Sequence, residues 1–78
     1  MRKKDIVSDI GLIIRELRIK KGLSQEDLSY KSNIHRTYIG TIERAEKVAS
    51  IITLEKIAIA LDIRLSDIFQ TYESRKQE

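Results

Sequence analysis

The segment from Gln25 to Arg44 places the strongest constraint on the fold, because its pattern is that of two short helices joined by a tight turn. Ser24 precedes the first helix as a candidate N-cap, and Asp27 follows three residues later, which approximates a capping box. Asn33 lies at the turn, and asparagine tolerates the left-handed conformation better than most non-glycine residues. We therefore expect one helix to end at this turn and a second helix to begin directly after it.

The second of these helices has an apolar side and a polar side. On a helical wheel of about 100° per residue, the mainly apolar side gathers His35, Tyr38, Ile39 and Ile42. The opposite side is polar or small and consists of Arg36, Thr37, Gly40, Thr41 and Arg44. This polar side offers hydrogen-bond donors, small groups for close approach, and guanidinium groups that fit a guanine edge or a phosphate. Taken alone, this face fits a helix that contacts nucleic acid and a solvated helix face equally well, and the surrounding pattern favours the first.

The rest of the chain is predicted to be nearly all helix, because it contains no proline and only three glycines. A first helix is expected from about Ser8, which would cap it, to Lys21. A fourth helix is expected after a cap at Ser50 and would run to about Leu61, and a fifth would follow a cap at Ser66. Together with the two short helices, these patterns predict an all-α fold with five helices.

Apolar residues recur at helical spacing on the longer helices and predict the core. In the first helix they are Ile10, Ile13, Ile14 and Leu17, and in the fourth they are Ile51, Leu54, Ile57, Ala58 and Leu61. The 78 residues are expected to form one domain, with a polar N-terminal arm over residues 1–7 and a frayed tail over residues 74–78.

The composition argues against several classes of function. The chain has no cysteine and a single histidine, so neither a disulfide framework nor a metal cluster is expected. It has no Ser/His/Asp set, no nucleophilic cysteine and no glycine-rich phosphate loop, so we expect neither an enzyme nor a bound cofactor. No apolar run approaches the roughly 20 residues of a membrane span. The start MRKKDIVSDIG lacks the apolar core of a signal peptide, so a cytoplasmic protein is expected.

The basic residues are unevenly distributed along the chain. Residues 1–44 hold ten Lys or Arg against six Asp or Glu, whereas residues 45–78 hold five against six. The positive excess therefore accompanies the two-helix segment, as binding to DNA phosphates requires. Chance segregation in a small basic protein would give the same balance.

The whole pattern from Ile10 to Phe69 resembles a known family. The strings GLSQEDLSYKSNIHRTYIGTIER, ITLEKIAIAL and LSDIF are similar to the Xre-like helix-turn-helix group, which includes the lambda repressor and Cro proteins. Within this group, HRTYIGTIER and the short length resemble the controller proteins of restriction–modification systems. The chain departs from them at Asn33, where the turn usually has Gly, and at Gly40 and Thr41, where controllers more often have Ser and then Gly. The resemblance implies a compact five-helix, lambda-repressor-like DNA-binding domain.

The resemblance also implies a function. It implies a sequence-specific transcription regulator, cytoplasmic and nucleoid-associated, that binds double-stranded DNA at its own promoter as a homodimer. Such a controller would activate at low occupancy and repress at high occupancy. Glu43, Arg44 or the adjoining loop would be available to touch RNA polymerase. A phage-type repressor, an antitoxin, and a helical module that binds another protein are alternatives for the same fold.

Contacts with DNA are expected around the polar side of the second short helix, from Gln25, Arg36, Thr37, Tyr38, Gly40, Thr41, Arg44 and Lys47. Arg36, near the helix start, would donate to a guanine edge. Arg44, Lys47 and Gln25 are placed for phosphate. By resemblance, Lys47 corresponds to a basic loop residue that contacts DNA, and Tyr38 to a controller tyrosine that reaches it.

Two further sets of residues have expected structural roles. An apolar surplus beyond what a five-helix core of this size would bury predicts a dimer interface made by Ile59, Ile63, Leu65 and Phe69. Alternatively, Phe69 belongs to the core alone. The resemblance implies a partly buried ion pair between Arg18 and Glu43, which would join the first helix to the end of the third.

Overall fold

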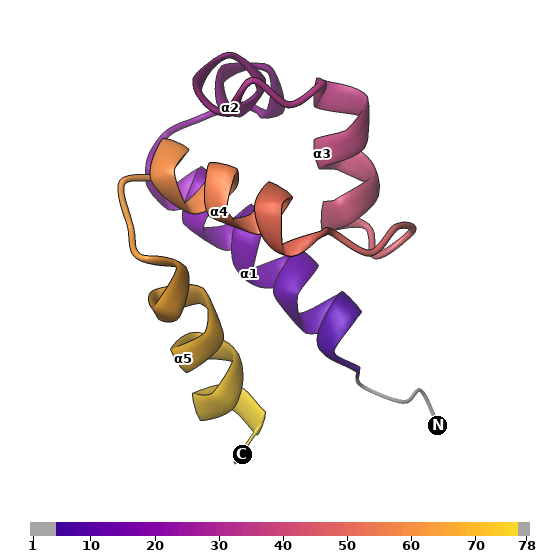
Figure 1. The fold of residues 1–78 in the computed structure, drawn as a ribbon, viewed down its shortest axis with the longest axis vertical. Helices are drawn as coiled ribbons and strands as arrows, with labels where there is room; N and C mark the ends of the chain where they lie inside the picture. The colour runs from indigo at the N-terminus through magenta and orange to yellow at the C-terminus, as the bar shows by residue number, and fades with distance from the viewer. Residues whose placement is uncertain (1–4, 77–78) are drawn as a thin grey trace.

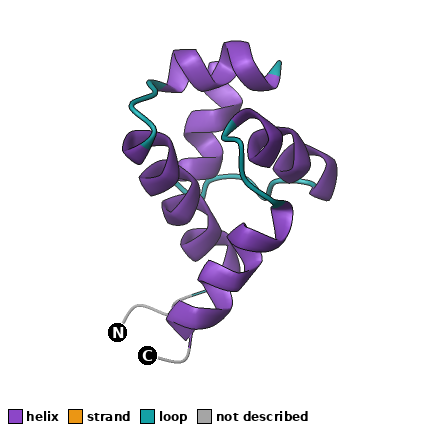
Figure 2. Cartoon of the chain, turned by 90° about the vertical axis from the view of Figure 1, so that its left-hand side faces the viewer, coloured by secondary structure: helices purple, strands orange, loops and turns teal. Residues whose placement is uncertain are grey.

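The computed structural model describes residues 5–76, and every regular element in that range is a helix. The five helices are α1 (Ile6–Lys20), α2 (Gln25–Ser32), α3 (Arg36–Glu43), α4 (Ile51–Ala60) and α5 (Leu65–Lys76). Figure 1 shows α2 and α3 together at one end of the molecule and α5 at the other, with α1 and α4 between them. Figure 2, turned by 90°, shows the short loops that join the helices. The expected all-α fold with five helices is confirmed for this part of the chain.

The first helix begins earlier than expected. Asp5, and not Ser8, is its N-cap, because Oδ1 of Asp5 accepts a hydrogen bond of 2.8 Å from the backbone N–H of Ser8. Aspartate caps a helix as well as serine does, so two candidate caps three residues apart compete and the earlier one yields the longer helix. The N-terminal arm expected over residues 1–7 therefore enters the helix at Ile6, and residues 1–4 lie outside the described range.

The last helix differs at both ends. It begins at Leu65 without the expected Ser66 cap, because Asp67 accepts a 2.8 Å hydrogen bond from the backbone N–H of Arg64. It then continues to Lys76, through most of the tail that was expected to fray. An ion pair between Arg75 and Glu16 joins this last turn to α1. Residues 77–78 lie outside the described range.

The other helix boundaries agree with their predicted caps. Ser24 and Asp27 form a full capping box at the start of α2, and Ser50 caps α4 by accepting from the backbone N–H of Thr53. Asn33 has a φ of 59°, the left-handed conformation expected at the turn between α2 and α3. Ala45, directly after α3, adopts the same conformation with a φ of 60°.

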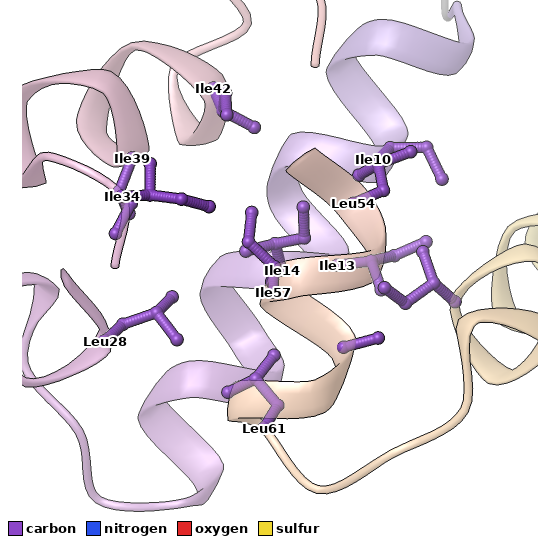
Figure 3. Packing of buried hydrophobic residues seen from close by; sticks show 12 residues of the cluster. Ile10, Ile13, Ile14, Leu28, Ile34, Ile39, Ile42, Leu54, Ile57 and Leu61 are labelled. Atoms are coloured by element: carbon purple, nitrogen blue, oxygen red, sulfur yellow. The ribbon is translucent and has the colours of Figure 1, made fainter. Parts of the chain in front are cut away.

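The core joins all five helices around α1 and α4. Figure 3 shows Ile14 of α1 and Ile57 of α4 at the centre of the apolar cluster, and both side chains are fully buried. The buried apolar residues are Ile10, Ile13, Ile14, Leu28, Ile34, Ile39, Ile42, Leu54, Ile57, Ala58, Leu61 and Ile68. Ile51 was predicted to belong to this set, but it is 72% exposed. It occupies the first turn of α4, directly after a connection whose residues are mostly exposed.

At Gly11, α1 lies close against the end of α3. A Cβ at this position would lie 2.3 Å from the backbone oxygen of Ile42 and 3.1 Å from that of Glu43. These are backbone atoms at the end of a packed helix, so they cannot move aside as a flexible side chain would. Gly11 therefore sets the separation of α1 from the end of α3.

Gly11→Ala is expected to lower the free energy of unfolding by about 1–3 kcal/mol, the usual cost of overpacking. This loss would appear even though alanine favours an isolated helix by up to about 1 kcal/mol over glycine. Urea melts followed by circular dichroism measure it. Gly40→Ala is the matched control, because its nearest neighbours are side-chain ends that can move. Equal stability of Gly11→Ala and the wild type would contradict the close approach.

Candidate nucleic-acid interface

The start of α3 presents two exposed polar side chains. His35 caps the helix, since its Nδ1 accepts a 3.0 Å hydrogen bond from the backbone N–H of Thr37. Arg36 and Thr37 follow in the first turn and are both exposed, as the helical wheel predicts. Nη1 of Arg36 lies 3.7 Å from Oε2 of Glu26 on α2, and both side chains remain more than 60% exposed. The guanidinium group of Arg36 is therefore free to reach a partner at little cost.

The middle of α3 is less exposed than the wheel predicts. Tyr38 is half-buried against the core, and the Thr41 hydroxyl donates a 2.7 Å hydrogen bond to the backbone oxygen of Tyr38. Gly40 was expected on an open face, but it is buried. The ends of two side chains lie over it: a Cβ at position 40 would be 2.9 Å from Nη1 of Arg44 and 3.4 Å from Oε1 of Gln25. The helical wheel of α3 considers that helix alone, so it does not show that Gln25 of α2 lies over Gly40.

A buried ion pair fixes α3 relative to α1 and α2. Nε and Nη2 of Arg18 donate to the two carboxylate oxygens of Glu43 at 2.7 and 3.0 Å, and Nη1 donates to the backbone oxygen of Leu23 at 2.8 Å. The side chains of Arg18 and Glu43 are 9% and 2% exposed. The hydrogen bond to Glu43 raises the pKa of Arg18 above its ordinary value. The pair implied by the resemblance is thus present, and it is more deeply buried than expected.

Glu43 also organises the start of α2. Nε2 of Gln25 donates a 3.0 Å hydrogen bond to Oε1 of Glu43, which places the Gln25 carboxamide beside Gly40. The carboxylate of Glu43 consequently accepts three hydrogen bonds within the protein. Of the three alternatives given for a contact with RNA polymerase, the structure disfavours Glu43, because its carboxylate is buried and engaged in these hydrogen bonds.

The end of α3 carries a second, exposed ion pair. Nε and Nη2 of Arg44 donate to the two carboxylate oxygens of Glu46 at 3.0 and 3.2 Å, and both side chains are about half exposed. The hydrogen bonds of this pair raise the pKa of Arg44 and lower the pKa of Glu46. Lys47, the next residue, is exposed in the connection to α4. Glu46 and Glu26 were not predicted, since only the folded chain brings each carboxylate to an arginine.

The four residues of the predicted dimer interface do not share one environment. Ile59 on α4 is 70% exposed, whereas Ile63, Leu65 and Phe69 are half-buried and pack against the core. Phe69 also lines an apolar groove bounded by the start of α1 and the connection before α4, and Ile59 does not line it. Ile59 is therefore the member of the set whose side chain is most open to a partner.

Two observations bear on other classes of function. Within residues 5–76, no group of three or more His, Cys, Asp or Glu is arranged to hold a metal ion. None of the helices in that range is long and apolar enough to cross a membrane.

Known proteins share both the sequence pattern and the fold. A helix-turn-helix family model matches residues 14–68. Control protein C.MunI from Mycoplasma sp is 37% identical over 70 residues, which are 88% of this chain and 95% of that protein. Control protein C.BamHI from Bacillus amyloliquefaciens is 39% identical over 59 residues, 74% of this chain and 73% of that one. The restriction–modification controller protein C.Esp1396I, solved as a tetramer with its natural 35 base-pair operator, has a TM-score of 0.88 at 34% identity, covering 97% of this chain and 100% of that one.

Proposed function

The chain belongs to the helix-turn-helix family, and we propose that it is a sequence-specific DNA-binding transcription regulator of the restriction–modification controller type. The exposed start of α3 carries the proposal. Arg36 and Thr37 lie on the second helix of the helix-turn-helix, where a recognition helix meets base edges in the major groove. The likeness to C.Esp1396I, which was solved on its operator, supports the same orientation. A regulator and not an enzyme is the function that these residues favour.

The residues around α3 then divide into three proposed roles. Arg36 reads a guanine edge, and Thr37 and Tyr38 contribute at the same surface. Arg44 and Lys47 bind phosphates, and so fix the position of the helix without reading sequence. Gln25, Gly40 and Thr41 support this surface from the side, since Gln25 and Arg44 lie over Gly40.

Binding to duplex DNA tests this proposal directly. Duplexes selected from a random library by the purified chain would be compared with scrambled duplexes by fluorescence anisotropy at several salt concentrations. We expect selected sequences to bind at least about 1000-fold more tightly than scrambled ones. The logarithm of the binding constant should fall linearly with the logarithm of the salt concentration, with a slope of about 0.9 for each phosphate neutralised. A helical module that binds another protein would select no sequence and would show little affinity for either duplex.

We also propose that the chain binds as a homodimer through the surface that includes Ile59, Ile63, Leu65 and Phe69. Ile59 is 70% exposed, and Ile52, seven residues earlier on the same face of α4, is 68% exposed. Covering such apolar side chains with a second copy would place two recognition helices on one face of the duplex.

Ile59→Ser is expected to weaken this dimer at least tenfold while leaving the fold intact, because Ile59 contributes little to the core. Sedimentation equilibrium at micromolar concentration measures the association. Leu12→Ser on α1, where the side chain is 43% exposed, is the matched control and should leave association unchanged. A wild-type chain that stays monomeric with and without DNA would refute the dimer.

The proposed regulator acts in the cytoplasm, in association with the nucleoid, on the promoter of its own gene. Activation at low occupancy and repression at high occupancy would time the expression of an endonuclease. A reporter driven by the native upstream region should therefore respond non-monotonically to the dose of the protein. A flat response would remove the controller role and leave the DNA-binding role in place. Any contact with RNA polymerase would come from Arg44 or the following loop, since Glu43 is buried.

A further inference from the structure

We propose that Glu46 limits the affinity of the protein for DNA by holding the Arg44 guanidinium in place of a phosphate. The proposal rests on the proposed function, because it assigns Arg44 to the DNA backbone. The new element is that the Glu46 carboxylate competes with the DNA phosphates for Arg44. Glu46 is thus a positioning residue that acts through Arg44.

The geometry of the pair resembles that of a phosphate contact. Two nitrogens of Arg44 donate to the two oxygens of one carboxylate, at 3.0 and 3.2 Å. A phosphate offers the same two-oxygen edge to a guanidinium fork, so phosphate and Glu46 compete for the same donors. Because both side chains are about half exposed, a phosphate can approach without unfolding any part of the helix.

The backbone builds this arrangement into the end of α3. Ala45 separates the two partners and has a φ of 60°, a conformation that alanine adopts only at a cost. The backbone N–H of Glu46 donates 2.8 Å to the oxygen of Thr41, which turns Glu46 back over the last turn of the helix. The Glu46 carboxylate is thereby brought to a residue only two positions earlier.

The Arg44 side chain also lies close to Gly40. Its Nη1 is 2.9 Å from the position that a Cβ on Gly40 would take, and Oε1 of Gln25 is 3.4 Å from the same position. The buried carboxylate of Glu43 lies close enough to raise the pKa of Arg44 further. Arg44 therefore lies beside Gly40 with its guanidinium already paired to Glu46 before any DNA binds.

Removing the Glu46 charge should then strengthen binding to DNA of any sequence. For Glu46→Gln we expect a gain of about twofold to fivefold on scrambled duplex at low salt, in line with the strength of exposed ion pairs. The gain should be the same on selected duplex, because a phosphate contact carries no sequence information. The plot of log binding constant against log salt concentration should become steeper by up to about 0.9, to the extent that Glu46 keeps Arg44 from its phosphate in the wild-type complex.

A double-variant cycle separates this mechanism from simple repulsion between Glu46 and DNA. The gain from Glu46→Gln should largely vanish in an Arg44→Ala background, because no guanidinium is left to release. Glu55→Gln, an equal change of charge on an exposed residue of α4, is the control and should leave the slope unchanged. In the free protein, the NMR signal of the Arg44 Nε–H should show slow exchange with water that Glu46→Gln abolishes.

The outcomes distinguish the two proposals. If the wild-type chain binds neither selected nor scrambled duplex, the proposed function and this inference both fail. If it binds selected duplex but Glu46→Gln gives no gain, or gives the same gain with and without Arg44, the inference alone is overturned. A gain that depends on Arg44, with the steeper salt slope, supports it.

Discussion

Glu43→Ala is expected to lower the free energy of unfolding by about 3–5 kcal/mol, because it leaves the buried Arg18 guanidinium without its partner. Three hydrogen bonds to the Glu43 carboxylate would be lost at once, from two nitrogens of Arg18 and from Gln25. A domain of this size has a total stability of only about 4–12 kcal/mol. The variant should therefore be partly or wholly unfolded at 37 °C, which is measurable as a lost or strongly lowered melting transition.

A double-variant cycle tests whether the loss belongs to the pair. Arg18→Met combined with Glu43→Leu should recover much of the stability lost in either single variant, since apolar side chains of similar volume can replace a buried ion pair. Glu16→Ala, which removes an exposed partner of Arg75, is the control and should cost about 1 kcal/mol or less. Losses at Arg18 and Glu43 that simply add in the double variant would show that the two residues are not coupled.

The caps at Ser24 and Ser50 and the turn at Asn33 could be predicted because their chemistry is local. A side-chain oxygen at the N-cap accepts from a backbone N–H three residues later, and both groups are visible in the sequence. The same reasoning placed the start of α1 at Ser8 although the chain uses Asp5. Two equivalent caps stood within one turn, and local chemistry alone does not rank them.

The residues that the sequence did not reveal or placed in the wrong environment are those whose surroundings come from other helices. Nothing in the sequence distinguishes Gly11. Only the folded chain shows that a Cβ at this position would lie 2.3 Å from the backbone oxygen of Ile42, so that a larger residue would not fit. Gly40 was assigned to an open face because its wheel includes α3 alone, and the side chain of Gln25 comes from α2. Ile51 fits the apolar period of α4, yet periodicity does not reveal where the neighbouring helices stop.

Arg36→Ala is expected to weaken binding to a selected operator far more than binding to scrambled duplex. The Arg36 fork would donate to O6 and N7 of a guanine, a contact worth about 1–3 kcal/mol of discrimination, or about fivefold to 150-fold in affinity ratio. The exposed contact with Glu26 at 3.7 Å does not hold the side chain strongly, so the guanidinium is available to the base. One or two base positions should lose their preference in a new selection made with the variant.

Lys47→Ala is the variant to compare with Arg36→Ala, because the strength of a phosphate contact does not depend on the base sequence. It should weaken selected and scrambled duplexes by the same factor and lower the salt slope by about one unit. Both variants remove one exposed positive charge, so a difference between them reflects the role of the side chain and not the net charge. Measurement of both on the two duplexes at two salt concentrations decides the assignment. If Arg36→Ala loses the same factor on both duplexes, Arg36 binds phosphate, and the base contact must come from Thr37 or Tyr38.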